Sequence, residues 1–124
     1  MSRLPGNVRA WWVRRRPIYL VKVDVDRGRP LSIRELVKRL ARAHRRPVWL
    51  AQRRSPSGRG WHVVIRVCPL PRSACETVAL QLLCGSDVYR EAYNVQRARR
   101  VDGREVPRWW RHPDHWNVLY EWSR

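Results

Sequence analysis

The run from Ile18 to Asp26 constrains the fold of this chain more than any other segment. Its first residues are mostly apolar, with β-branched side chains among them, and charged and apolar residues then alternate. Such a run predicts a β-strand, and its apolar first half favours a central place in a sheet. In the second half, charged side chains share one face and valines share the other (Lys22, Asp24 and Asp26; Val21, Val23 and Val25). The strand therefore presents two carboxylates on one face.

Helix and strand signals alternate along the rest of the chain. Capping boxes at 32–35 and 73–76 each precede an apolar stripe of helical period, and Ser86 or Asp87 can cap a third helix from Val88 to about Arg100. Strands are expected at 48–52 and 61–67, as a hairpin around a Gly/Ser/Pro loop, and a closing strand at 116–122.

The resulting order, β-α-β-β-α-(α)-β, predicts an α+β fold of the ferredoxin-like or RNA-recognition-motif-like (RRM-like) kind. In that plan the helices cover one face of a four-stranded antiparallel sheet, and the other face stays open. The first and third strands are adjacent and central. Residues 1–16 are expected to form a basic arm or a first edge strand, and residues 17–124 a single domain with an extra basic helix.

Charge restricts the class of partner. The chain has 27 Lys+Arg against 10 Asp+Glu, for a net charge of +17. An excess of this size is typical of proteins that bind a polyanion, and DNA or RNA is the leading expectation because each neutralised phosphate releases counterions. An anionic membrane surface is the alternative. Codon usage in a GC-rich genome, archaeal or viral for example, explains arginine in place of lysine but not the shortage of acids.

Apolar runs are too short to span a bilayer, and no secretory signal is visible. We therefore expect no membrane partner and a cytoplasmic protein, or a virus-encoded protein that acts in the host cytoplasm. The three cysteines include no CxxC pair and are expected to be reduced and mostly buried. His112 and His115 form an HxxH pair that could join a cysteine in a zinc site.

Three segments carry candidate chemistry. Asp24 and Asp26 could jointly hold Mg²⁺ or Mn²⁺, which prefers carboxylate oxygen and shares its coordination shell with substrate phosphates. In the segment Ser57 to His62, glycines let the backbone approach a phosphate, while arginine and histidine can donate to it. The helix after Asp87 is arginine-rich and could bind nucleic acid through Arg90, Arg97, Arg99 and Arg100. The ordinary alternatives are a strand-end turn, a glycine hairpin and a solvated basic face.

Together these segments resemble the catalytic core of the archaeo-eukaryotic primase superfamily, which includes primase-polymerases of plasmids and viruses. The apolar strand ending in DxD corresponds to Tyr19 to Asp26, and the Ser-Gly-rich turn before a histidine to Ser57 to His62. The resemblance implies a DNA replication protein that performs metal-dependent nucleotidyl transfer on a DNA template, with nucleoside triphosphates as substrates and other replication proteins as further candidate partners.

By this resemblance Asp24, Asp26 and His62 are the catalytic residues. Asp24 and Asp26 would hold the metal with a third acid, for which Asp87 and Glu121 are the alternatives. Ser57, Gly58, Arg59 and His62 would bind the nucleotide.

Two other functions fit the same sequence. A non-catalytic module could stack single-stranded bases on an open sheet and track phosphates with arginines; the candidate stacking residues are Trp49, Trp61, Tyr120 and Trp122. A replication-initiator nuclease would need a nucleophilic tyrosine, and Tyr89 and Tyr93 have the spacing of one helical turn. Core packing is the expected role of these two tyrosines.

Overall fold

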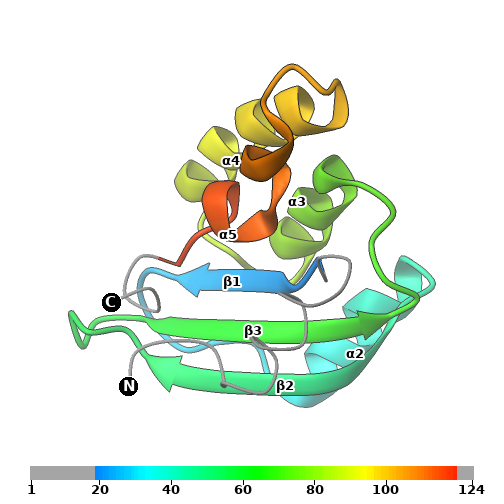
Figure 1. Ribbon diagram of the computed structural model, residues 1–124. Coiled ribbons are helices and arrows are strands. Elements are labelled where there is room, and N and C mark those ends of the chain that lie inside the picture. The colour runs from blue at the N-terminus through cyan, green and yellow to red at the C-terminus, as the bar shows by residue number, and fades with distance from the viewer. Residues whose placement is uncertain (1–18, 120–124) are drawn as a thin grey trace.

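The computed structural model of the protein describes residues 19–119. Three strands and three main helices, followed by two short helical turns, make up this part of the chain (Figure 1). In chain order they are β1 (Val21–Val25), α2 (Ile33–Arg42), β2 (Arg46–Arg54), β3 (Trp61–Cys68), α3 (Ala74–Leu83), α4 (Val88–Asp102), the 3₁₀ turn η1 (Arg108–Arg111) and α5 (Pro113–Trp116). The expected N-terminal arm, residues 1–16, lies outside the described residues.

The three strands form an antiparallel sheet in the order β1-β3-β2. β2 and β3 form the expected hairpin, and β1 pairs with β3 so that Asp24 lies opposite His62. The predicted neighbourhood of the first and third strands is therefore confirmed. The predicted central position of the first strand is wrong for the described sheet, since β1 lies at its edge and β3 at its centre.

Each main helix begins at a side chain that caps its first turn. The Ser32 hydroxyl accepts from the Glu35 amide at 3.1 Å, and the Ser73 hydroxyl accepts from the Glu76 amide at 3.1 Å. For α4 the cap is Asp87, whose carboxylate accepts from the Arg90 amide at 3.0 Å. The predicted N-caps Ser32 and Ser73 and the predicted third helix are thus confirmed, and a satisfied first-turn amide favours each helix start.

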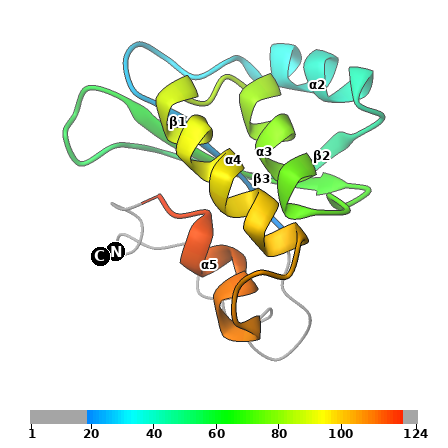
Figure 2. The same cartoon turned by 90° about the horizontal axis from the view of Figure 1, so that it is seen from above.

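The main core lies on the valine face of β1. Val21 and Val23 pack there with Leu36 and Leu40 of α2 and with Leu80 of α3. Figure 1 shows α2 behind the sheet and the pair α3 and α4 beyond the β1 edge, and the view from above in Figure 2 shows these two helices side by side. Helices thus cover one face and one edge of the sheet.

The second face of the sheet is not open along its whole length, contrary to the prediction. Leu20, Val64 and Leu119 form a separate buried cluster there, with Trp49 packed against it. His62, on the same face, is only 2% exposed. A base could not stack on this part of the sheet without displacing side chains.

The predicted closing strand is wrong over the residues that the structure describes. Trp116 ends α5, and residues 117–119 form no strand. Trp116 is fully buried against Val78 of α3 and Ala98 of α4, in a second core cluster between the helices. The described chain is therefore a small α+β fold with a three-stranded antiparallel sheet, and the fourth strand of an RRM-like plan is not among its described elements.

Candidate functional site

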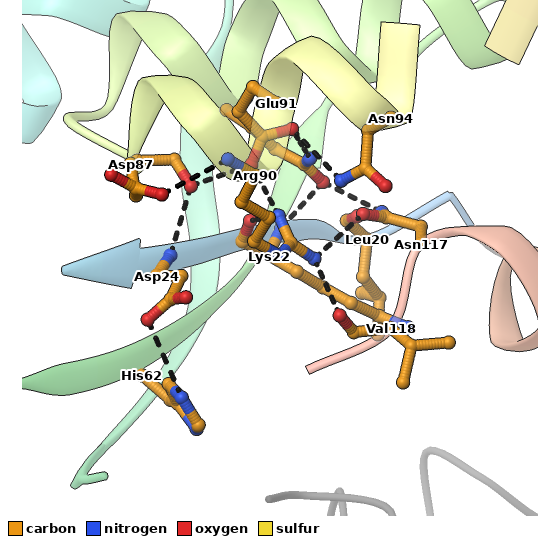
Figure 3. A network of polar contacts seen from close by, with 12 residues as sticks. Leu20, Lys22, Asp24, His62, Asp87, Arg90, Glu91, Asn94, Asn117 and Val118 are labelled. Carbon is orange, nitrogen blue, oxygen red and sulfur yellow. Dashed lines mark hydrogen bonds and ion pairs between the residues drawn. The ribbon is translucent and has the colours of Figure 1, made fainter. Parts of the chain in front are cut away.

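Asp24 and His62 face each other on neighbouring strands, as the sequence predicted. The register of β1 with β3 pairs them, and the Asp24 Oδ1 and His62 Nε2 atoms are 3.6 Å apart (Figure 3). The His62 side chain is 2% exposed, whereas 29% of the Asp24 side chain is exposed. The carboxylate therefore has one side toward the buried imidazole and another that a ligand can reach.

The glycine-containing loop between β2 and β3 approaches the end of β1. At Gly60 a Cβ atom would overlap the Val25 carbonyl oxygen and come within 2.7 Å of the Asp26 oxygen, so only glycine allows this approach. Asp26 itself lies just beyond β1 and is exposed. The loop is thus held against the backbone at the end of β1, and its phosphate-binding role stays a prediction.

The predicted nucleotide-binding residues belong to this loop. The Ser57 hydroxyl is 2.8 Å from the Ser55 hydroxyl and accepts from the Arg59 amide at 3.3 Å, which shapes the turn. Gly58 has a φ of +77°, and the side chain of Arg59 is exposed. Of these residues, Arg59 has the side chain best placed to meet an anion from solvent.

Asp87, one of the two alternatives for a third acid, lies next to Asp24. Its backbone amide donates to the Asp24 carbonyl oxygen at 2.7 Å, while its carboxylate caps α4. Both residues line the same pocket. The other alternative, Glu121, lies outside the described residues.

This pocket has a volume of about 440 Å³, a size suited to a small-molecule ligand. Asp24 and Asp87 line it, and Tyr89, Tyr93 and Arg97 of α4 line it as well. Leu119 contributes an apolar wall. The pocket thus lies between two acidic residues and an aromatic and basic helix face.

Arg90 has a structural position that the sequence did not predict. Its two terminal nitrogens donate to four acceptors within the protein (the Lys22 and Val118 carbonyl oxygens, Asn117 Oδ1 and the Glu91 carboxylate). Its side chain is 12% exposed. These contacts give Arg90 a structural role beside the pocket that it also lines, and its contact with nucleic acid stays a prediction.

Glu91 lies at the centre of this buried network and was missed by the sequence analysis (Figure 3). Its carboxylate accepts from Gln81 at 2.7 Å, Ser86 at 2.6 Å, Asn94 at 3.1 Å and the Arg90 guanidinium. Glu91, Asn94, Ala98 and Val101 form the buried stripe of α4. Polar residues at core-facing positions of an amphipathic helix were the signal that could have revealed the network.

The network also satisfies the outer edge of β1. The Lys22 amide donates to Gln81 Oε1 and the Asp24 amide to the Ser86 hydroxyl, each at 3.0 Å. The outward carbonyl oxygens accept from side chains or from the α3–α4 connection (Leu20 from Asn117, Lys22 from Arg90, Asp24 from Asp87). Side chains thus take the place that a fourth strand would occupy beside residues 20–24.

The remaining arginines predicted to bind nucleic acid lie toward the end of α4. Arg97 is half-buried at the pocket, and Arg99 and Arg100 are exposed in the last turn. Exposed guanidinium groups on one helix are available to phosphates, and that role stays a prediction for all three.

Carboxylates at this site suit a hard cation. Asp24 and Asp87 line one pocket, and Asp26 follows at the end of β1. Proteins often hold Mg²⁺ with one or two carboxylates, while water and substrate phosphates supply the other ligands. Across residues 19–119, no three His, Cys, Asp or Glu side chains are grouped as metal ligands. Binding of Mg²⁺ or Mn²⁺ by these carboxylates stays a prediction.

The HxxH histidines and the cysteines lie away from this pocket. The His112 and His115 rings meet edge to face with centroids 6.3 Å apart, and no third ligand joins them among the described residues. Cys84 is buried, Cys75 is partly buried and Cys68 is exposed, so the prediction of mostly buried thiols holds in part. Burial raises the pKa of Cys84 to about 12, and burial together with Asp102 raises the pKa of Cys75 to about 11.

In comparisons with protein-family models, curated proteins and solved structures, nothing matches this chain. The class of protein is therefore given by its fold alone, which is a small α+β domain with a three-stranded antiparallel sheet. Within residues 19–119, every helix is too short or too polar to cross a membrane.

Proposed function

We propose that this protein binds nucleic acid and performs metal-dependent nucleotidyl transfer on a template at the Asp24 end of the pocket. One observation carries the proposal: Asp24 lies opposite His62, beside Asp87, and at the edge of a pocket of about 440 Å³. Asp24, Asp87 and the buried His62 come from three separate segments, and the glycine loop approaches the backbone at the end of β1. The net charge of +17 supports a polyanionic partner.

Asp24 and Asp87, with Asp26 nearby, would hold Mg²⁺ or Mn²⁺ together with nucleotide phosphates. Such a metal neutralises charge on the triphosphate as the leaving group departs. His62 positions the Asp24 carboxylate from its buried side, and Arg59 in the exposed loop binds a phosphate oxygen. Arg97, Arg99 and Arg100 hold the nucleic-acid strand.

The test is primer extension with the full chain, a primer–template, Mn²⁺, and dNTPs or NTPs. Asp24→Asn keeps the size of the side chain but removes the charge that holds the metal. Product formation should fall roughly 100-fold or more, since metal stabilisation of the transition state contributes several kcal/mol. Glu105→Gln removes an exposed carboxylate away from the pocket and serves as the matched control. Equal product from the wild type and Asp24→Asn would refute the proposal, as would the absence of product with every template.

A second candidate is a non-catalytic single-stranded nucleic-acid-binding module on the same fold. The exposed arginines of α4 and the exposed tyrosines beside them favour it. The tryptophans first predicted to stack bases are less suited, because Trp49 packs on a buried cluster and Trp61 lies under the Arg54 guanidinium at 5.2 Å; Tyr120 and Trp122 lie outside the described residues. Tight binding by the wild type without any nucleotide incorporation would decide for this candidate.

A further inference from the structure

We infer that Tyr89 and Tyr93 form a stacking platform for unpaired bases, so that the ligand along α4 is a single-stranded nucleic acid. This inference rests on the nucleic-acid-binding part of the proposed function and is independent of nucleotidyl transfer. It also replaces the prediction that these two tyrosines pack in the core, which is wrong: Tyr89 is 77% exposed and Tyr93 is 67% exposed.

Spacing places the platform on one helix face. Tyr89, Tyr93 and Arg97 follow one another at intervals of four residues within α4, and residues at this interval lie on the same face of a helix. All three line the pocket that also reaches Asp24 and Asp87. Two aromatic rings and a guanidinium group are thus arranged in a row at the pocket wall.

Charge gives this row a direction. Asp87 at the start of α4 and Arg97 near its end are ten residues apart, about 15 Å along the helix axis. This length corresponds to about four base steps of 3.4 Å. Phosphates are attracted at the Arg97 end, while the carboxylates at the other end would repel them unless a cation is bound. A strand would therefore place its phosphates at the Arg97 end, with its bases on the two tyrosines.

Unpaired bases suit the platform better than duplex DNA. Every base has a π-face that can stack on an aromatic ring, but in a duplex that face is covered by the neighbouring base pairs. Exposed guanidinium groups, by contrast, bind phosphates of either form. The tyrosines are therefore expected to add a base-dependent contribution to an otherwise electrostatic interaction.

Fluorescence anisotropy with two labelled probes separates these contributions. One probe is a short oligodeoxythymidine, and the other is an oligonucleotide of equal length in which every nucleotide is abasic, so that only the phosphates remain. The wild type should bind oligodeoxythymidine at least about 5-fold more tightly than the abasic strand, since each stacked base is expected to strengthen binding about 5- to 150-fold. The double variant Tyr89→Ala/Tyr93→Ala should bind both probes with the same, weaker affinity.

Two further variants serve as controls. Tyr89→Phe/Tyr93→Phe keeps the rings and should retain the preference for bases, whereas Trp109→Ala removes an exposed aromatic ring outside the pocket and should change nothing. An oligouridine probe shows whether the platform accepts RNA as well as DNA, and stacking predicts that it accepts both.

The failures of the two proposals are distinguishable. If the wild type binds the abasic strand as tightly as oligodeoxythymidine, or if the double alanine variant keeps the preference for bases, the platform is refuted while nucleic-acid binding stands. If the wild type binds neither probe at low salt, both the platform and the proposed function are overturned.

Discussion

Replacement of Glu91 by alanine tests whether the buried polar network stabilises the fold and its site. Glu91 is buried, with 1% of the residue exposed, and its carboxylate accepts from Gln81, Ser86, Arg90 and Asn94. The variant leaves the Arg90 guanidinium, itself 12% exposed, without its buried counter-charge. Three neutral donors lose an acceptor at the same time.

The expected loss of stability follows from this geometry. Removing one partner of a buried ion pair costs about 3–5 kcal/mol, because the other charge stays desolvated. The total stability of a domain of this size is about 5–15 kcal/mol, so the variant should remain folded at room temperature but with a much reduced margin. Glu91→Gln keeps the volume and one acceptor oxygen, and should cost less, about 2–3 kcal/mol.

Urea unfolding followed by tryptophan fluorescence measures the difference, since the chain contains eight tryptophans. Glu105→Ala removes an exposed carboxylate and should stay within about 0.5 kcal/mol of the wild type. A loss below about 1 kcal/mol for Glu91→Ala would show that water solvates the site in solution. The buried network would then not be what holds the edge of β1.

Two other features of the structure lead to predictions that need no ligand. Gly60→Ala should destabilise the fold far more than Gly58→Ala, because a Cβ atom at Gly60 would overlap the backbone of Val25. A Cβ atom at Gly58 would meet open space, and alanine there would only have to adopt a φ of +77°. Equal urea midpoints for the two variants would contradict this prediction. Native protein should expose one fast-reacting thiol, Cys68, while Cys84, whose pKa of about 12 keeps it protonated below that pH, should react only on unfolding. Persistence of the fast phase in Cys68→Ser would show this assignment to be wrong.

Local signals in the sequence were sufficient for most elements. The capping residues Ser32, Ser73 and Asp87 begin helices where the pattern placed them, since a cap acts on amides within its own turn. The alternation in β1 likewise identified its core face and put Asp24 on the face of His62. These features depend on neighbours in sequence or on one strand pairing.

The prediction of a closing strand was wrong over the described residues because the sequence pattern was ambiguous. An apolar run that contains Trp116, Val118 and Leu119 fits a buried strand, a helix end or a coil that covers a core, and periodicity alone does not separate these possibilities. The structure uses Trp116 to fill the space between α3 and α4, and Asn117 to bind the Gln81 side chain at 2.7 Å. Both choices depend on contacts between distant parts of the chain.

Among residues 19–119 no strand pairs with the outer edge of β1, and this explains how the site is assembled. A strand hydrogen-bonded to residues 20–24 would lie between β1 and the start of α4 and would separate them by the width of one strand, about 4.8 Å. The Asp87 amide could not then donate to the Asp24 carbonyl oxygen, as it does at 2.7 Å. By covering that edge with Gln81, Ser86 and Arg90, the protein brings the first turn of α4 against the end of the DxD strand. The same network that replaces a strand therefore places Asp24 and Tyr89 beside one pocket, and a variant that loosens it should weaken the site as well as the fold.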